Sequence, residues 1–251
     1  MNYLEVETID TVTTPGNTTT AGAFTDGFTV GGTFLPLNQF HFHSPSEHTV
    51  NGAHYPLEMH MVHKLFTASA VNTTVVSGTT PGAYNVQAAV IGIMFTYECV
   101  PLQLTRRSPL AKSMRGTDRR FLCMLPSPAF NNGTFMTKLI NALATLPTPT
   151  NLTATSEAEA TVLETNQQFD LIKDVFNVID PSKYYTYAGS LTTPACTEGI
   201  TWFNMANPMY MSPLQLLEFT RLLALKQGDM GRGGDNRLIQ PLNGRKVSAS
   251  F

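Results

Sequence analysis

The strongest structural signal in the sequence is Phe34-Leu-Pro-Leu-Asn-Gln-Phe-His-Phe-His43, followed by Tyr55-Pro-Leu-Glu-Met-His-Met-Val-His-Lys-Leu65. Both are apolar runs in which polar residues recur two positions apart, which is the period of a β-strand with two different faces. Asn51-Gly52, between them, is the strongest short turn signal in the chain. The pattern predicts two long strands that pair antiparallel across this turn.

The same alternation gathers the histidines, because all six lie between positions 41 and 63. In a strand, successive side chains point to opposite faces, so His41 and His43 share one face with Gln39. On the next strand, His60 shares a face with Glu58 and Val62. A neighbouring antiparallel strand can bring His60 close to His41 and His43. Three imidazoles with water in the fourth position form a catalytic zinc geometry.

The acceptors expected around such a site are also present. Metal-bound histidines usually donate their second ring N–H to a carboxylate or another acceptor. Gln39 lies two residues before His41, and Glu58 lies two residues before His60, each on the face of its ligand. His48 and His63 lie off this face and are interpreted as hydrogen-bonded structural residues. His54, beside the turn, is expected to be exposed and to have no role.

Composition excludes several other classes of protein. The chain has 251 residues, 14% of them charged, and 16 Lys and Arg against 18 Asp and Glu give a net charge of −2. This balance excludes a basic nucleic-acid stripe over the whole molecule. The longest apolar run, 88–95, is far shorter than the ~20 residues of a membrane-spanning helix. Abundant threonine favours strands over long exposed helices.

The rest of the chain predicts one mainly β domain, residues 1–251, with short peripheral helices. Further expected strands lie at 4–8, at 87–97 and, as strand, turn and strand, within 184–203. Helical spacing is found at 135–146. A second helix is expected from Pro213 to 223, with Ser212 as its N-terminal cap. Residues 167–178 are expected to be helical or mixed. Residues 99–134 are locally basic. They are interpreted as a solvated insertion, and a site for an acidic partner is the alternative.

Three blocks of sequence then resemble the alpha-class carbonic anhydrases. The first contains Gln39-Phe-His-Phe-His43, Ser46-Glu-His-Thr-Val50 and Glu58-Met-His-Met-Val-His63. The second is Tyr187-Ala-Gly-Ser-Leu-Thr-Thr-Pro-Ala-Cys-Thr-Glu-Gly-Ile-Thr-Trp202. The third is the tail, including Gln240-Pro-Leu-Asn-Gly-Arg245. The resemblance covers most of the chain and implies a large, mostly antiparallel, twisted central sheet with zinc at the bottom of a cone.

The resemblance also implies a role for each matching residue. His41, His43 and His60 would be the zinc ligands, Glu58 would orient His60, and Gln39 would orient His41. Glu47 would accept a hydrogen bond from Thr192, and Thr192 would accept one from zinc-bound hydroxide. Thr193 would contact bicarbonate, and His48 and Tyr187 would support the site from behind. Carbon dioxide would lie against an apolar wall formed by Val62, Val90, Leu191, Ile200 and Trp202.

The implied activity is the reversible hydration of carbon dioxide to bicarbonate and a proton, a lyase reaction. Zinc lowers the pKa of bound water to about 7, so hydroxide is present at neutral pH. The substrate is a small molecule, and neither a nucleic acid nor a membrane span is implied. Two alternatives remain: an inactive carbonic-anhydrase-like binding or structural module, and a zinc hydrolase acting on esters.

Several positions depart from the family pattern. The family carries some 60 residues before the point at which this chain begins, so the chain is expected to be N-terminally short. The alignment places Asn2 at the proton-shuttle position, and Asn cannot titrate. Cys196 is expected to be unpaired, and Cys99 and Cys123 are a candidate disulfide pair. Four Asn-x-Thr sequons favour an extracellular or secretory-pathway location; they begin at Asn17, Asn72, Asn132 and Asn151.

Overall fold

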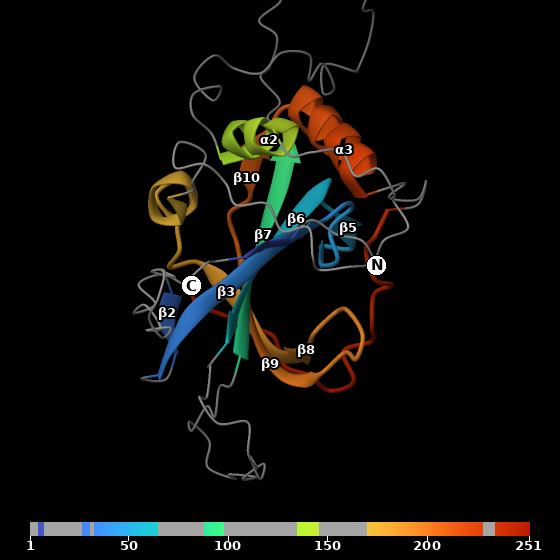
Figure 1. Cartoon of the computed structure of the whole chain (residues 1–251). Helices are drawn as coiled ribbons and strands as arrows, with labels where there is room; N and C mark the ends of the chain where they lie inside the picture. The colour runs from blue at the N-terminus through green and yellow to red at the C-terminus, as the bar shows by residue number, and fades with distance from the viewer. Residues whose placement is uncertain are drawn as a thin grey trace, which may run out of the picture.

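The computed structural model describes residues 5–7, 27–30, 33–64, 88–97, 135–145, 170–227 and 234–251. Within them, nine strands form one curled sheet (Figure 1). Its main path runs β1-β3-β6-β7-β9-β8-β11, with β2 beside β3 and β10 beside β7. The strands are β1 (Glu5–Glu7), β2 (Gly27–Val30), β3 (Thr33–His43), β6 (Leu57–Lys64), β7 (Ala88–Tyr97), β8 (Tyr184–Ser190), β9 (Glu198–Met205), β10 (Met209–Met211) and β11 (Ser248–Ala249).

The prediction of a large, mostly antiparallel sheet is confirmed, with the addition that the sheet is mixed. β7 runs parallel to both β9 and β10, and the other pairings are antiparallel. A parallel pair needs a long connection, and about a hundred residues separate β7 from β9. That all these strands join one sheet supports a single domain over 1–251, which remains a prediction.

The turn at Asn51-Gly52 corrects one detail of the predicted hairpin. β3 and β6 do pair antiparallel. The turn, however, closes a separate two-stranded hairpin of β4 (Thr49–Val50) and β5 (Ala53–His54) inserted between them. Asn51 and Gly52 have φ values of 53° and 78°, the positive values that a tight two-residue hairpin turn requires.

The main core lies on the sheet face opposite the histidine cluster. Met59 and Met61 of β6 point into it and are buried beneath two helices, α2 (Phe135–Thr145) and α3 (Pro213–Gln227). These helices pack side by side at one end of the sheet (Figure 1). The expected cap of α3 is confirmed, because Ser212 Oγ accepts from Gln215 N at 3.1 Å and Gln215 Oε1 accepts from Ser212 N at 2.8 Å.

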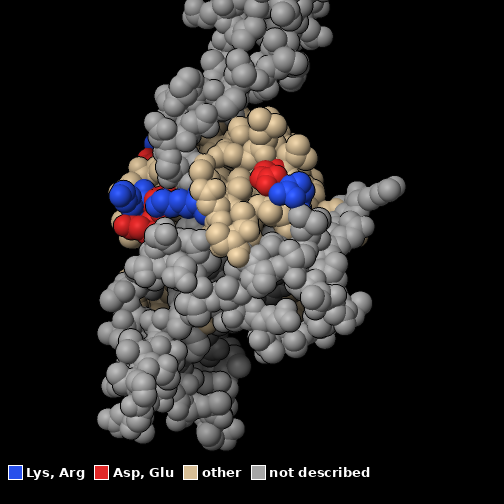
Figure 2. Space-filling model, turned by 45° about the horizontal axis from the view of Figure 1, so that its top comes forward, with Lys and Arg blue, Asp and Glu red and all other residues tan. Residues whose placement is uncertain are grey.

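The region predicted as helical or mixed contains a short π-helical segment, η4 (Ile172–Phe176). Lys138 of α2 donates to both carboxylate oxygens of Asp174 in η4, at 2.7 and 2.6 Å. On the face shown in Figure 2, the Lys and Arg atoms of the described residues lie beside Asp and Glu atoms. No described helix is both long and apolar enough to cross a membrane. The basic segment 99–134 lies outside the described residues.

His63, on the core-facing side of β6, makes stability depend on pH. Its ring is buried, packs edge-on against Phe28 at 4.6 Å, and has its Nδ1 3.0 Å from the Met61 carbonyl oxygen. Burial lowers the pKa of His63 from 6.5 to about 4. The folded state therefore binds fewer protons than the unfolded state between these values, and stability is lost as the pH falls from 6.5 towards 4.

We expect protonation of His63 to lower the free energy of unfolding by up to about 3 kcal/mol as the pH falls across this range. The measurement is urea unfolding of the metal-free protein at pH 7.0 and 4.5, compared with the His63→Leu variant. The difference between the two pH values should be smaller in the variant. An equal loss in both proteins would contradict the assignment.

Candidate metal centre

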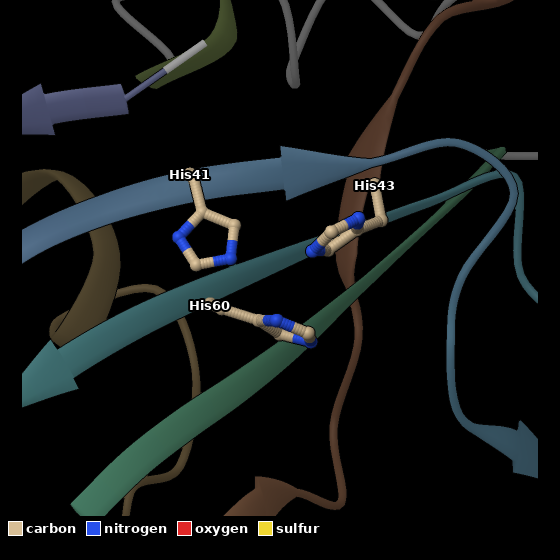
Figure 3. Close-up of side chains that lie close together, drawn as sticks. All are labelled: His41, His43 and His60. Carbon is tan, nitrogen blue, oxygen red and sulfur yellow. The ribbon is translucent and has the colours of Figure 1, made fainter. Parts of the chain in front are cut away.

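Strand register brings the three predicted ligands together. His41 of β3 lies directly opposite His60 of β6, and His43 lies opposite Glu58. The three imidazoles are buried, with exposed fractions of 7%, 1% and 1% for His41, His43 and His60. One ring nitrogen from each falls within 4.8 Å of the other two. Figure 3 shows the rings facing one another from the two strands.

His41 is oriented by Gln39, as predicted. Gln39 Oε1 accepts a hydrogen bond from His41 Nδ1 at 2.8 Å, and both side chains are buried. The pKa of His41 is lowered to about 2, first by burial and then by the charges of His60 and His43. His41 is therefore neutral at pH 7, the state in which imidazole binds metals.

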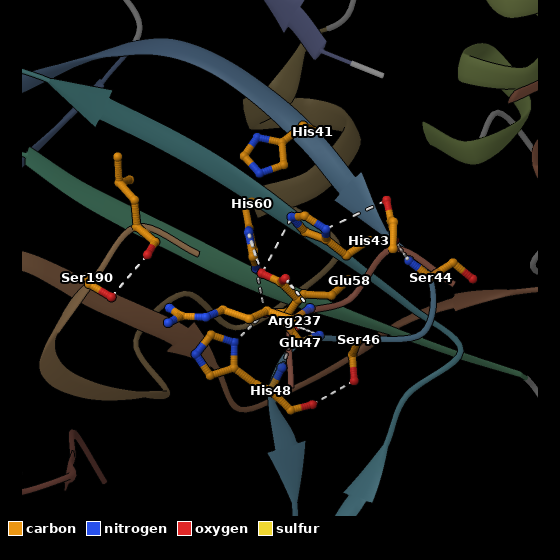
Figure 4. A network of polar contacts seen from close by, with 12 residues as sticks. His41, His43, Ser44, Ser46, Glu47, His48, Glu58, His60, Ser190 and Arg237 are labelled. Atoms are coloured by element: carbon orange, nitrogen blue, oxygen red, sulfur yellow. Dashed lines mark hydrogen bonds and ion pairs between the residues drawn. The ribbon is translucent and has the colours of Figure 1, made fainter. Parts of the chain in front are cut away.

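Glu58 is the centre of the polar network around the site (Figure 4). Its side chain is fully buried. Oε1 lies 2.9 Å from His60 Nε2 and 2.6 Å from His48 Nδ1, while Oε2 accepts the backbone N–H groups of Glu47 and His48 at 2.8 and 2.9 Å. Burial alone would raise the pKa of Glu58, but His48 and His60 outweigh it and hold this pKa well below the usual range.

His48 and Tyr187 extend this network away from the ligands. His48 Nε2 lies 2.7 Å from the Tyr187 hydroxyl, so the predicted hydrogen bonding of His48 is confirmed. Burial would lower the pKa of His48, but the neighbouring Glu58 carboxylate raises it. His54 is exposed, as predicted, but it is not without contacts: its Nδ1 lies 2.6 Å from the carbonyl oxygen of Ser46, which joins β5 to the segment before β4.

His43 is supported from the C-terminal part of the chain. Its Nδ1 lies 3.7 Å from Asp235 Oδ2, and Asp235 Oδ1 accepts from Ser44 N at 2.9 Å. Burial, and after it the charge of His60, lower the pKa of His43 to about 3. A hydrogen bond with the Asp235 backbone acts in the opposite direction and raises this pKa. Gly234, at φ +83°, permits this close approach, because a Cβ there would collide with the Ser44 backbone.

The expected hydrogen bond between Glu47 and Thr192 is not formed in this structure. Glu47 Oε1 accepts from Arg237 N at 2.7 Å, and the buried Oε2 has no hydrogen-bond partner among the described residues. Oε2 is instead directed at the imidazoles, 3.5 Å from His43 Nε2 and 3.9 Å from His60 Nδ1. Thr192 and Thr193 lie half-buried in the bend after β8.

The predicted apolar wall is a real cluster, separate from the main core. Val62, Val90, Ile200 and Trp202 pack together and contact Leu191, Tyr187 and Ala88. Trp202 lies edge-on to His60 with 4.7 Å between ring centroids, and its Nε1 donates to the Ser190 carbonyl at 3.0 Å. The cluster therefore borders the histidines directly.

Sequence reasoning gave no role to several residues near the site, among them Ala88, Asn204, Asp235, Arg237 and Arg245. Ala88 could have been found from strand alternation, because it lies two residues before Val90 in β7 and therefore on the same face. Asp235 and Arg245 have no comparable signal, because they lie in irregular segments. Of the other predicted residues, Asn2, Cys99 and Cys123 lie outside the described residues, and Cys196 is half-buried and not in a disulfide.

Gly92 of β7 sits where Glu58 and Asn204 approach the strand most closely. A Cβ at this position would collide with the Asn204 carboxamide and lie 3.1 Å from Glu58 Oε1. We expect Gly92→Ala to reduce the free energy of unfolding by about 1–3 kcal/mol, the usual cost of overpacking, and to weaken metal binding by displacing Glu58. Urea unfolding and zinc titration measure the two effects.

Asn204→Ala provides the control, because it removes the group that the new methyl group would strike. Asn204 Oδ1 is buried and has no hydrogen-bond partner among the described residues, so no such bond is lost with it. The double variant should be more stable than the sum of the single changes predicts. Additive losses would show that the collision is not the cause.

The curled sheet and its buried three-histidine cluster define a β-sheet protein with a site able to hold a metal. The family model described as eukaryotic-type carbonic anhydrase matches residues 4–103 and 131–251. The chain therefore belongs to the carbonic anhydrase family. The unmatched stretch, 104–130, falls within the predicted insertion at 99–134.

Individual relatives agree with this assignment. A carbonic anhydrase of Klebsiella pneumoniae is 32% identical over 230 residues, covering 92% of this chain and 62% of that protein. The chain thus spans less than two thirds of that relative's length. A halotolerant carbonic anhydrase from Dunaliella salina superposes with a TM-score of 0.52 at 26% identity, over 88% of this chain and 63% of that one. Dioscorin complexed with ascorbate shares the fold, with a TM-score of 0.53 at 22% identity, over 99% of this chain and 70% of that one.

Proposed function

We propose that this chain catalyses the reversible hydration of carbon dioxide to bicarbonate and a proton, with a zinc ion held by His41, His43 and His60. The observation that carries the proposal is the convergence of three buried ring nitrogens within 4.8 Å of one another. Fold alone would not suffice, since one fold hosts many functions and dioscorin shares this one.

The donor set fits zinc. Low pKa values keep His41 and His43 neutral, and Gln39 and Glu58 hold the second nitrogens of His41 and His60. Those contacts leave His41 Nε2 and His60 Nδ1 as the nitrogens that would bind the metal. A zinc ion held by three neutral imidazoles would act as a Lewis acid and lower the pKa of its bound water to about 7.

The protein residues would then select and orient the reactants. Thr192 would donate to Glu47 and offer a lone pair to the attacking group, so that only a group carrying a proton is accepted. The buried Glu47 Oε2, which has no hydrogen-bond partner among the described residues, is able to accept this bond. The apolar cluster around Trp202 would hold carbon dioxide, and Thr193 would contact bicarbonate.

Zinc content and carbon dioxide hydration, measured on one preparation, test the proposal. We expect one zinc per chain and hydration that a sulfonamide inhibits. Activity should be lost on dialysis against a chelator and should return with added zinc. Stoichiometric zinc without hydration would favour the inactive binding or structural module. Ester cleavage without hydration would favour the zinc hydrolase, and a chain that binds no zinc would refute the proposal.

A further inference from the structure

Arg245 is exceptional in the C-terminal segment. Every residue from 238 to 251 is exposed except Arg245, which is half-buried. A turn at Asn243 and Gly244, with φ values of 48° and 79°, directs its side chain inward. The guanidinium group is held by two carbonyl groups: Nε donates to Leu242 at 2.9 Å and Nη2 donates to Pro241 at 2.7 Å.

The guanidinium group held in this way lies over the ring of Tyr187. Its central carbon is 5.7 Å from the ring centroid, which is within cation–π range. The same ring is parallel to Trp202, with a 6.2 Å separation and an interplanar angle of 6°. Tyr187 is therefore held in its orientation by both a cation and an aromatic plane.

Tyr187 in turn leads to the metal site through short polar contacts. Its hydroxyl lies 2.7 Å from His48 Nε2, and His48 Nδ1 lies 2.6 Å from Glu58 Oε1. That same carboxylate oxygen lies 2.9 Å from His60 Nε2. A continuous path of contacts thus joins Arg245 to His60, a proposed zinc ligand. Along this path lie Tyr187 of β8, His48 of the connection between β3 and β6, and the Glu58 carboxylate.

We propose that Arg245 is a positioning residue for the metal site: by fixing Tyr187, and through it His48 and Glu58, it holds His60 in its ligand orientation. The inference rests on the proposed function, because it assigns His60 to zinc. Substitution of residues that orient a metal-binding histidine directly usually weakens metal affinity 10- to 100-fold. A residue acting through Tyr187 should have a smaller effect, of about 3- to 10-fold.

A purely structural role, anchoring the tail, is the competing explanation. The tail has other attachments, however. β11 pairs with β8, Ser250 N donates to the Tyr184 carbonyl at 3.0 Å, and Phe251 packs edge-on against Tyr185. The segment that contains Arg245 is therefore not held by Arg245 alone, and the effect on the metal can be separated from the effect on tail docking.

The experiment measures zinc affinity by competition with a chelator for the unaltered protein, Arg245→Gln, Arg245→Lys and Tyr187→Phe. Arg245→Gln should bind zinc more weakly, and Arg245→Lys, which keeps the charge, should recover part of the loss. Lys246→Gln, at the exposed neighbouring position, should match the unaltered protein. Urea unfolding of each metal-free variant reports any general destabilisation.

The decisive comparison is Arg245→Gln in the Tyr187→Phe background. Phenylalanine keeps the ring but has no hydroxyl to hydrogen-bond with His48 Nε2, so the polar path is broken and Arg245→Gln should then have no further effect on zinc affinity. The visible spectrum of the cobalt-substituted protein should change with Arg245→Gln and not with Lys246→Gln.

Two results would overturn the inference while leaving the proposed function intact: an unchanged affinity in Arg245→Gln, or an equal loss in both backgrounds. Failure of the unaltered protein to bind zinc would refute the proposed function and the inference with it. A misfolded Arg245→Gln variant leaves Arg245→Lys and Tyr187→Phe to decide. An unchanged zinc affinity in Tyr187→Phe would overturn the inference, because the path from Arg245 to His60 runs through the Tyr187 hydroxyl.

Discussion

Replacing His60 by alanine is expected to remove stoichiometric zinc and, with it, hydration of carbon dioxide. A protein zinc site contributes about 10–16 kcal/mol of binding free energy, so the loss of one ligand should cost about 3–4 kcal/mol, or two to three powers of ten in affinity. Metal analysis after gel filtration and chelator competition measure the effect. We expect the same result for His41→Ala and His43→Ala.

His63→Ala is the matched control for this change. His60 and His63 lie on the same strand, and both are buried, with exposed fractions of 1% and 3%. They point to opposite faces, so only one substitution touches the cluster. His63→Ala should lose stability through the cavity it creates and retain zinc. Wild-type zinc affinity in His60→Ala, or equal zinc loss in both variants, would contradict the ligand assignment.

Glu58→Gln should produce the second large effect, on stability and zinc affinity together. The buried carboxylate accepts four hydrogen bonds, from two backbone N–H groups and two imidazoles. An amide presents N–H groups to at least one of these donors and removes the negative charge beside His48. Leaving a buried group without its charged partner costs about 3–5 kcal/mol, and zinc affinity should fall about 10- to 100-fold.

Urea unfolding of the metal-free protein and chelator competition separate the two consequences of Glu58→Gln. Glu218→Gln serves as the control, because Glu218 lies on the surface of α3 and pairs only with Arg221 among the described residues. It should leave zinc affinity unchanged. If Glu58→Gln left both stability and zinc affinity unchanged, Glu58 would not be the centre of the network.

Strand periodicity explains why the ligand cluster could be predicted from the sequence. From Gln39 to His43 in β3, and along β6, side chains alternate between faces, so the identities at 39, 41, 43, 58 and 60 are enough to place them together; the register shift in β3 falls before this stretch, between Leu37 and Gln39. The parallel pairing of β7 with β9 could not be predicted in this way, because it joins segments about a hundred residues apart. Alternation also does not reveal that the Asn51-Gly52 turn belongs to a smaller hairpin.

The contacts from the C-terminal segment were hidden for a different reason. Glu47 is held by the backbone N–H of Arg237, and backbone groups are the same at every position. The resemblance to carbonic anhydrases implied a bond from Thr192 to Glu47, but Glu47 Oε2 lies 3.5 Å from His43 Nε2 and 3.9 Å from His60 Nδ1. Contacts from irregular segments carry no periodic signal.

The long reach of these contacts also governs when the site can be completed during synthesis. Glu47 depends on a residue 190 positions later, and Ser44 on one 191 positions later. The histidine-bearing strands leave the ribosome well before the segment that supports them, because almost two hundred residues lie between the two. Contacts of such sequence separation form slowly. A nascent chain that has not yet reached Arg237 therefore holds the three histidines without these supports, and the cluster is completed only when that segment has emerged.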